Sequence, residues 1–164
     1  MAIKARRTTV NDEKLKYLID TYADTILRLS FSYLKNVQDA EDVCQIVFVK
    51  IYNLNKTFND TKHEKAYLLH ITANVCKDML KNTWKKERVD FESIGEIEAP
   101  TIEENEILHK VNELEEKYRI IIYLHYYEGY KVSEIAKILK ISVANTKVRL
   151  FRGREKLKTI LEAN

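Results

Sequence analysis

Residues 132–150 have the sequence VSEIAKILKISVANTKVRL, which predicts two short helices joined by a tight turn. Apolar residues at helical spacing form the inner face of the first helix: Ile135, Ala136 and Leu139. Ile141 is expected to fill the turn. Ser142 can then accept a hydrogen bond from the free backbone N–H groups that open a second helix. This order of features is typical of a helix-turn-helix.

The second helix, expected over residues 143–161, begins with polar and basic side chains. A helix-turn-helix places this end in the major groove, where Asn can pair with adenine and Arg with guanine, while other basic residues contact phosphates. The residues expected to contact duplex DNA are Ser142, Ala144, Asn145, Lys147, Arg149, Arg152 and Arg154. Val148 and Leu150 are the expected core anchors. A solvated basic helix that ends an ordinary bundle is the alternative interpretation.

The helix-turn-helix is expected to close a C-terminal domain that spans residues 102–164. Three apolar residues predict a short helix at its start: Ile107, Val111 and Leu114. A strongly apolar helix is expected over residues 118–127, ending at Glu128 and Gly129. From Lys131 onward nine Lys and Arg residues stand against three Glu residues, a net charge of +6. A basic domain of this kind suits a polyanionic partner.

An acidic segment precedes this domain. Residues 87–106 hold eight acidic residues against Arg88 alone, and they include Gly95 and Pro100. Like charges repel one another and disfavour contact with DNA. Residues 89–101 are therefore expected to form a flexible linker.

The N-terminal domain is expected to span residues 1–88 and to contain three amphipathic helices. The first is expected over residues 11–34, the second starts near Asp39 as its cap, and the third covers residues 63–86. A polar loop, residues 53–62, joins the last two. The expected inward-facing residues are Leu15, Leu18, Ile19, Tyr22, Ile26, Leu29 and Tyr33 in the first helix, Ala40, Val43, Cys44, Val47, Phe48 and Ile51 in the second, and Ala66, Leu69, His70, Ala73, Cys76 and Leu80 in the third.

The composition favours helices and excludes several classes of protein. The 164 residues include 3 Gly and 1 Pro, whereas all-β folds need many turn residues. The 2 Cys lie in apolar helical patterns, and no Cys and His residues have zinc-site spacing. No apolar segment is long enough for a membrane span or a signal peptide. We therefore expect an all-α fold of two small helical domains in a cytoplasmic protein, with no cofactor, metal site or catalytic residue.

Two blocks of the sequence resemble the extracytoplasmic-function group of the sigma-70 family of RNA polymerase sigma factors. The first block comprises residues 39–48, DAEDVCQIVF, and residues 66–80, AYLLHITANVCKDML, which are similar to regions 2.2 to 2.4 of the family. The second comprises residues 114–157, which resemble region 4. Relatives usually have Gly at the turn position of Lys140, where this chain is expected to take a left-handed conformation. They have an apolar core residue where this chain has Thr146.

The resemblance implies a role in transcription initiation. The β′ coiled coil of core RNA polymerase is expected to bind a polar face of the second helix, formed by Asp39, Glu41, Asp42 and Gln45. From its charge alone, this face would be interpreted as a solvated surface. The third helix and the loop before it are expected to hold the −10 element as an unstacked strand through Lys62, Tyr67, Asn74, Lys77, Asp78 and Lys81. The helix-turn-helix is expected to bind the −35 element as duplex.

Further partners implied by the resemblance are the β flap of the polymerase and an anti-sigma factor, which in relatives is often tethered to a membrane. No small-molecule substrate is expected. Two other functions were considered for this chain. A helix-turn-helix regulator without a polymerase-binding domain would explain residues 114–161 but not the first block. An enzyme acting on nucleic acid is disfavoured because the sequence has no Walker loop, metal cluster or nucleophile–base motif.

Overall fold

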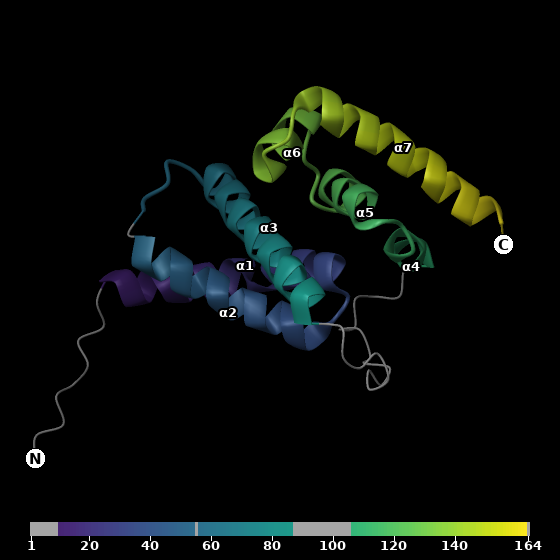
Figure 1. The fold of residues 1–164 in the computed structure, drawn as a ribbon. Helices are drawn as coiled ribbons and strands as arrows, with labels where there is room; N and C mark the ends of the chain where they lie inside the picture. Colours follow the sequence, from purple (N-terminus) through teal and green to yellow (C-terminus); the bar gives the residue numbers. More distant parts are fainter. Residues whose placement is uncertain (1–9, 55, 87–105, 164) are drawn as a thin grey trace, which may run out of the picture.

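The computed structural model describes residues 10–54, 56–86 and 106–163, with side chains for residues 12–54, 56–82 and 106–163. Every regular element in these ranges is helical. The N-terminal bundle contains α1 (Val10–Leu34), α2 (Val37–Leu54) and α3 (Thr61–Lys86) (Figure 1). The C-terminal bundle contains α4 (Glu106–Asn112), α5 (Glu116–Ile122), the π-helical turn η1 (Tyr123–Tyr127), α6 (Val132–Leu139) and α7 (Val143–Glu162). The predicted all-α fold with two helical regions is confirmed, while the expected linker, residues 89–101, lies outside the described residues.

The apolar stripe of α1 forms the centre of the N-terminal bundle. Five of its predicted members are buried: Leu18, Tyr22, Ile26, Leu29 and Tyr33. Ile19 was expected to join them, but its side chain is 39% exposed. Each residue of a helix is rotated by about 100° from its neighbour. Ile19, directly after Leu18, therefore points toward solvent at the edge of the stripe.

Short polar side chains set where α2 and α3 begin. The Asp39 backbone N–H donates to Asn36 Oδ1 at 2.9 Å, so Asn36 caps α2 and the predicted cap, Asp39, lies inside the helix. The His63 backbone N–H donates to Asp60 Oδ1 at 2.8 Å. Each cap satisfies one N–H group that lacks an intrahelical partner. Both helices therefore start two residues earlier than the sequence patterns predict.

The apolar helix predicted over residues 118–127 is present as α5 and its extension η1. The Glu128 N–H donates to the Tyr123 carbonyl at 3.2 Å, a five-residue spacing that widens the last turn. Gly129 then ends the helix with φ +73°, a backbone conformation that costs glycine little. The predicted stop at Glu128 and Gly129 is confirmed.

The helix-turn-helix also forms at the predicted positions. Lys140 takes the left-handed conformation with φ 51°, and Ser142 Oγ accepts from the Asn145 N–H at 3.0 Å. The buried stripe of α7 is Thr146, Leu150 and Gly153. Gly153 gives α7 room beside α5, because a Cβ atom there would lie 3.2 Å from Ile122 Cγ1 and this side chain would have to shift by a few tenths of an ångström.

The burial of two residues in α7 differs from what the hydrophobic pattern predicts. Val148 was expected to anchor α7 but is 45% exposed, because two steps from Thr146 turn a helix by about 200°. Thr146 is fully buried despite its hydroxyl, which donates to the Ser142 carbonyl at 2.9 Å. A buried hydroxyl with a partner avoids the cost of an unsatisfied polar group.

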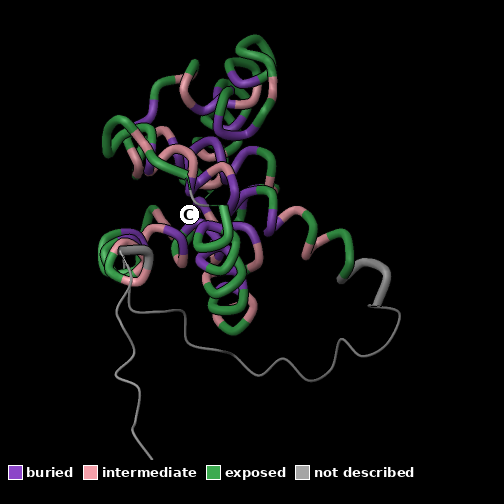
Figure 2. The backbone as a smooth tube through the Cα atoms, turned by 90° about the vertical axis from the view of Figure 1, so that its left-hand side faces the viewer, coloured by how far each residue is buried: buried purple, intermediate pink, exposed green. Residues whose placement is uncertain are grey.

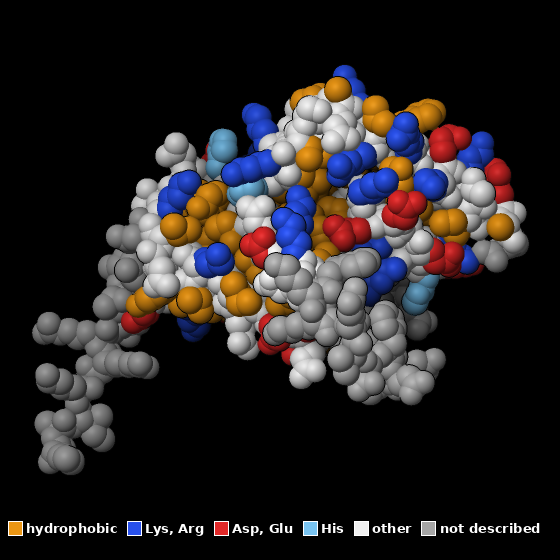
Figure 3. Space-filling view, viewed as in Figure 1, with side chains coloured by type: hydrophobic (Ala, Val, Ile, Leu, Met, Phe, Trp, Pro, Cys, Tyr) orange, Lys and Arg blue, Asp and Glu red, His pale blue; other side chains and the backbone are white. Residues whose placement is uncertain are grey.

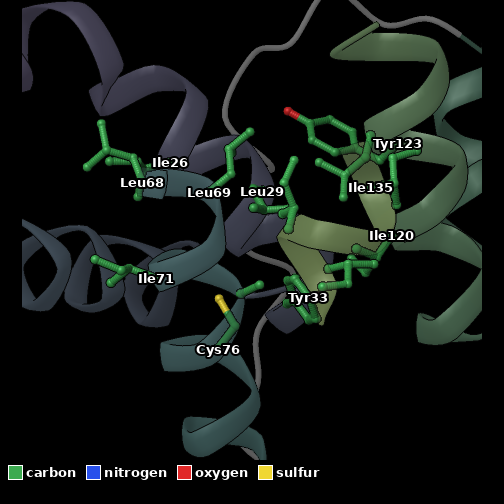
Figure 4. Packing of buried hydrophobic residues seen from close by; sticks show 14 of the residues in the cluster. Ile26, Leu29, Tyr33, Leu68, Leu69, Ile71, Cys76, Ile120, Tyr123 and Ile135 are labelled. Atoms are coloured by element: carbon green, nitrogen blue, oxygen red, sulfur yellow. The ribbon is translucent and has the colours of Figure 1, made fainter. Parts of the chain in front are cut away.

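The two bundles share one hydrophobic core. α3 packs against α1 and α2 and also against α6, and α1 contacts α5. Figure 2 shows buried segments of several helices around the middle of the molecule. Figure 4 shows Leu29 and Tyr33 of α1 near Ile120, Tyr123 and Ile135 of the C-terminal bundle. Among the described helices, none is long and apolar enough to cross a membrane.

Candidate nucleic-acid and polymerase interfaces

The polar face of α2 lies on the outside of the N-terminal bundle. Glu41, Asp42 and Gln45 are exposed and Asp39 is half-buried, whereas the opposite face of the helix is buried in the core. Two exposed apolar side chains lie on the same helix: Ile46 and Val49, the latter 60% exposed. The structure thus brings the four predicted residues together on one surface. Acidic groups beside apolar area suit a basic protein partner.

An aromatic and basic cluster lies at the start of α3. The Tyr67 ring lies 5.2 Å from the Phe58 ring, and Lys56 Nζ lies 4.1 Å from the centroid of Tyr67. Aromatic rings with a nearby cation are the groups that hold unstacked bases. The sequence pattern identified Tyr67 but missed Phe58 and Lys56. An aromatic residue and lysines in an otherwise polar loop were the available signal.

A cleft of about 530 Å³ joins this cluster to the middle of α3. It is lined by residues of α2, α3 and the turn of the helix-turn-helix: Lys50, Asn53, Leu54, Tyr67, His70, Ile71, Asn74, Val75, Asp78 and Lys140. Three of the residues predicted to bind the −10 element, Tyr67, Asn74 and Asp78, therefore lie around one cavity. Its size is within the range that holds small ligands and single bases.

Hydrogen bonds fix the orientation of Asn74. His70 Nδ1 lies 2.6 Å from the Ile138 carbonyl oxygen, and the Asn74 amide nitrogen lies 3.1 Å from His70 Nε2. A carbonyl oxygen only accepts, so Nδ1 of His70 carries a proton and donates it. Nε2 then accepts from Asn74. His70 thus connects a predicted DNA-binding residue of α3 to the backbone of α6.

The remaining predicted −10 residues differ in their surroundings. Lys62 forms an ion pair with Glu134 of α6 at 2.6 Å, which raises the pKa of Lys62. Lys77 is half-buried, and this burial lowers its pKa; Glu116 raises it, while Arg149 and Lys81 lower it further. Lys81 and Asp78 are exposed. Of the three lysines in this set, Lys81 faces solvent, whereas Lys62 and Lys77 interact with charged residues of the C-terminal bundle.

The start of α7 presents its polar side chains to solvent. Ser142, Ala144, Asn145, Lys147, Arg152 and Arg154 are exposed. Arg149 is half-buried, its Nε donates to Asn145 Oδ1 at 3.1 Å, and its charge acts on Tyr33 and Lys77 of the N-terminal bundle. Figure 3 shows Lys and Arg side chains over the C-terminal bundle with a few acidic groups among them.

Arg154 is exposed and also contacts a neighbouring aromatic residue. Its Nε donates to the Tyr126 hydroxyl at 2.6 Å, and its guanidinium lies 5.5 Å from the Tyr126 ring centroid. Tyr126 was not identified from the sequence because it lies in the apolar segment 118–127. The contact orients an exposed cation of α7, which suits contact with a phosphate.

Comparison with known proteins identifies both bundles. Residues 18–86 match the model of sigma-70 region 2, and residues 104–157 match sigma-70 region 4. Over 159 residues the chain is 30% identical to the ECF RNA polymerase sigma factor SigW of Bacillus subtilis, covering 86% of this chain and 85% of the relative. The chain belongs to the extracytoplasmic-function sigma factors. It directs RNA polymerase to promoters, and sigma factors are initiation factors rather than enzymes.

A second relative agrees with this membership, and two solved structures share the fold. SigX of the same bacterium is 26% identical over 165 residues, covering 92% of this chain and 85% of the relative. The sigma factor RpoE of Bartonella quintana, solved in complex with the anti-sigma factor NepR, has the same fold with a TM-score of 0.73 at 20% identity, over 93% of this chain and 99% of that one. CnrH in complex with the cytosolic domain of CnrY gives a TM-score of 0.65 at 21% identity, over 94% and 92% of the two chains. The match of residues 18–86 disfavours a regulator that lacks a polymerase-binding domain.

Proposed function

We propose that this sigma factor divides promoter recognition between its bundles, with the N-terminal bundle also binding core polymerase. The observation that carries the proposal is the presence of three surfaces of different chemistry on three different helices. They are the acidic face of α2, the aromatic cleft along α3, and the polar start of α7. We assign residues 1–88 to the first bundle, 89–101 to a linker and 102–164 to the second.

The α3 cleft binds the −10 element as a single strand in this proposal. Tyr67 with Phe58 and Lys56 offers a stacking platform, and Asn74 and Asp78 offer hydrogen-bonding groups on the cleft wall. Lys62, Lys77 and Lys81 supply positive charge along the same helix. Stacking is indifferent to base identity, whereas polar groups discriminate between base edges.

The start of α7 binds the −35 element in the major groove. Ser142, Ala144 and Asn145 lie in its first turn, the end of a recognition helix that approaches base edges. Lys147, Arg152 and Arg154 contribute phosphate contacts, which give affinity that depends on salt. Arg149 is the guanine-reading candidate because guanidinium binds guanine through two hydrogen bonds.

Polymerase and an anti-sigma factor are the protein partners that we propose. The face formed by Asp39, Glu41, Asp42 and Gln45 docks on the β′ coiled coil, and the C-terminal bundle approaches the β flap. One protein of the same fold was solved with the anti-sigma factor NepR and another with the cytosolic domain of CnrY, which supports a protein partner of this kind here. We place the protein in the cytoplasm, where RNA polymerase acts.

Reconstituted transcription tests the proposal. The purified chain is added to bacterial core RNA polymerase with fragmented genomic DNA of its source, and the transcript starts are mapped. We expect start sites that share two sequence elements upstream. An assay in which the chain binds core polymerase but yields no transcript beyond the polymerase-only control would contradict it.

A further inference from the structure

The connection between α2 and α3 carries one of the two rings of the aromatic cluster. Phe58 lies in this connection, whereas Tyr67 belongs to α3 itself. Residues 56–58 have no regular secondary structure, so no helical hydrogen bonds fix the place of the Phe58 ring. The position of this ring relative to Tyr67 must therefore come from contacts with other elements.

The start of α3, directly after this connection, is firmly fixed. Asp60 caps the helix by accepting from the His63 backbone N–H at 2.8 Å. The Tyr22 hydroxyl of α1 donates to Glu64 Oε1 at 2.9 Å, in the first turn of α3. Both contacts hold the helix, but neither involves residues 56–58.

Lys14 of α1 supplies the contact to the connection itself. Its Nζ donates to the Lys56 carbonyl at 2.7 Å, across 42 positions of the sequence. The same ammonium lies 5.9 Å from the centroid of the Phe58 ring. Among the described residues, this is the one hydrogen bond that joins residues 56–59 to another element. Because its donor is charged, this bond is a strong restraint on the backbone two residues before Phe58.

The restraint also places a second cation. Lys56 Nζ lies 5.9 Å from the Phe58 centroid and 4.1 Å from the Tyr67 centroid, and the two rings are 5.2 Å apart. A cation close to an aromatic ring is attracted to its face. A bond that fixes the Lys56 backbone therefore brings both a ring and an ammonium to Tyr67. A loop already ordered in this way costs less free energy when a ligand binds than one that must become ordered.

We propose that Lys14 is a positioning residue for the −10 strand. It fixes residues 56–58 so that Phe58 and Lys56 lie beside Tyr67 before DNA binds, and it acts through them without touching the strand. This inference rests on the proposed function where it concerns DNA, whereas the ordering of the connection can be tested in the free chain.

Side-chain NMR of the free, complete chain tests the positioning. Protons over the face of an aromatic ring are shifted upfield by its ring current, so the ε-methylene protons of Lys56 report whether its ammonium lies at Tyr67. We expect this upfield shift in the unchanged chain and loss of most of it in Lys14→Met, which has no donor. Lys14→Arg keeps a donor and should keep the shift.

A matched control separates this contact from a general loss of charge. Lys16→Met makes the same charge change at an exposed position of α1 and should give the spectrum of the unchanged chain at Lys56. Circular dichroism checks that all variants remain helical. No upfield shift in the unchanged chain, or the same shift in a folded Lys14→Met variant, would overturn the proposal.

Binding of a −10 single strand to the chain in complex with core polymerase tests the consequence. Lys14→Met should weaken binding about fivefold, as for loss of one exposed bond from a charged donor, and Lys14→Arg should restore it. The dependence of affinity on salt should stay unchanged, because no phosphate contact is lost. A slope of log affinity against log salt that is smaller by about 0.7 would show a direct phosphate contact and contradict a positioning role.

A double-mutant cycle asks whether Lys14 acts through the ring. Phe58→Ala removes that ring, and in this background Lys14→Met should weaken strand binding by only about twofold, because residues that act as a unit are not additive. The same loss of about fivefold in both backgrounds would show that Lys14 acts independently of Phe58 and would refute the assignment. Failure of the unchanged chain to bind the strand would instead contradict the proposed function, and the NMR result would still decide whether Lys14 orders the connection.

Discussion

At the scale of single residues, geometry separates side chains that the sequence pattern treats alike. Tyr67 and Arg149 were both predicted to contact DNA. Tyr67 lies in a cleft beside Phe58 and Lys56, while Arg149 is bonded to Asn145 and half-buried near the other bundle. Each therefore makes a different contribution, and each can be tested with a conservative variant that keeps one property and removes another.

Replacing Tyr67 tests the stacking platform. Tyr67→Ala should weaken binding of a −10 single strand by about 1–3 kcal/mol, the range for loss of one base–aromatic stack. Tyr67→Phe keeps the ring and should bind nearly as well as the unchanged chain. Fluorescence anisotropy of a labelled strand, taken from a mapped promoter and bound to the holoenzyme, measures both. Equal losses in the two variants would assign the effect to the hydroxyl and not to stacking.

Replacing Arg149 separates base reading from charge. Arg149→Ala should weaken binding to a −35 duplex by about 1–3 kcal/mol while leaving core polymerase affinity unchanged. Arg149→Lys keeps the charge but not the two-pronged hydrogen bonding, so it should bind the promoter and a scrambled duplex more equally. Competition binding with both duplexes measures the difference. Parallel loss of polymerase binding would contradict the proposed division between the bundles.

At the scale of elements, caps and neighbours explain where sequence patterns are reliable. The helix-turn-helix was predicted to the residue over residues 132–143, because its cap, Ser142, and its turn residue, Lys140, act locally. α3 was predicted with one buried face, yet Leu68, Ile71 and Val75 are buried as well. Those residues are covered because α3 has helices on several sides, which a one-helix pattern does not reveal.

The N-cap of the recognition helix should have a measurable value. Ser142→Ala removes the bond to the Asn145 N–H and should lower the free energy of unfolding by about 1 kcal/mol. Ser142→Asn restores a capping side chain and should recover most of that loss. Urea unfolding followed by circular dichroism measures both variants. Equal stability of the alanine and asparagine variants would show that the cap contributes little in this protein.

The polar face of α2 can be tested with one charge reversal. Asp42→Lys should weaken core polymerase binding at least tenfold, since a basic partner would then meet a like charge. The fold should be unaffected because Asp42 is exposed. Asp24→Lys, an equal charge change at an exposed position of α1, is the control and should bind normally. Unchanged affinity of the Asp42 variant would remove this face from the interface.

At the scale of the whole molecule, one core extends across both bundles. Cys76 of α3 shows this, because its side chain is fully buried and residues of both bundles affect its pKa. Ser30 of α1 lowers that pKa through a hydrogen bond, and the charge of Glu116 of α5 raises it. Because burial changes the pKa of this thiol, its protonation is coupled to the folding of the whole molecule.

Alkaline unfolding should reveal that coupling. Burial raises the pKa of Cys76 from 9.0 to about 12, so the folded chain keeps a proton that the unfolded chain loses. The contribution to stability is constant below about pH 9 and falls as pH rises from there toward 12, by about 1–2 kcal/mol at pH 10. Urea unfolding at pH 7.5 and pH 10, compared with Cys76→Ala, isolates this group. The two proteins should differ in their pH dependence; identical slopes would mean that Cys76 does not carry the effect.

The sequence by itself determined the helices, the helix-turn-helix and the family, because periodicity, caps and motifs act over a few residues. It also placed the polar face of α2 and three members of the α3 cleft, Tyr67, Asn74 and Asp78. Only the tertiary structure decided that Phe58 and Lys56 join Tyr67, that Ile19 and Val148 face solvent, and that Arg119 caps α1. The Arg119 contact joins residues 87 positions apart. Contacts of that separation depend on how whole helices pack, and no local pattern in the chain encodes their distances.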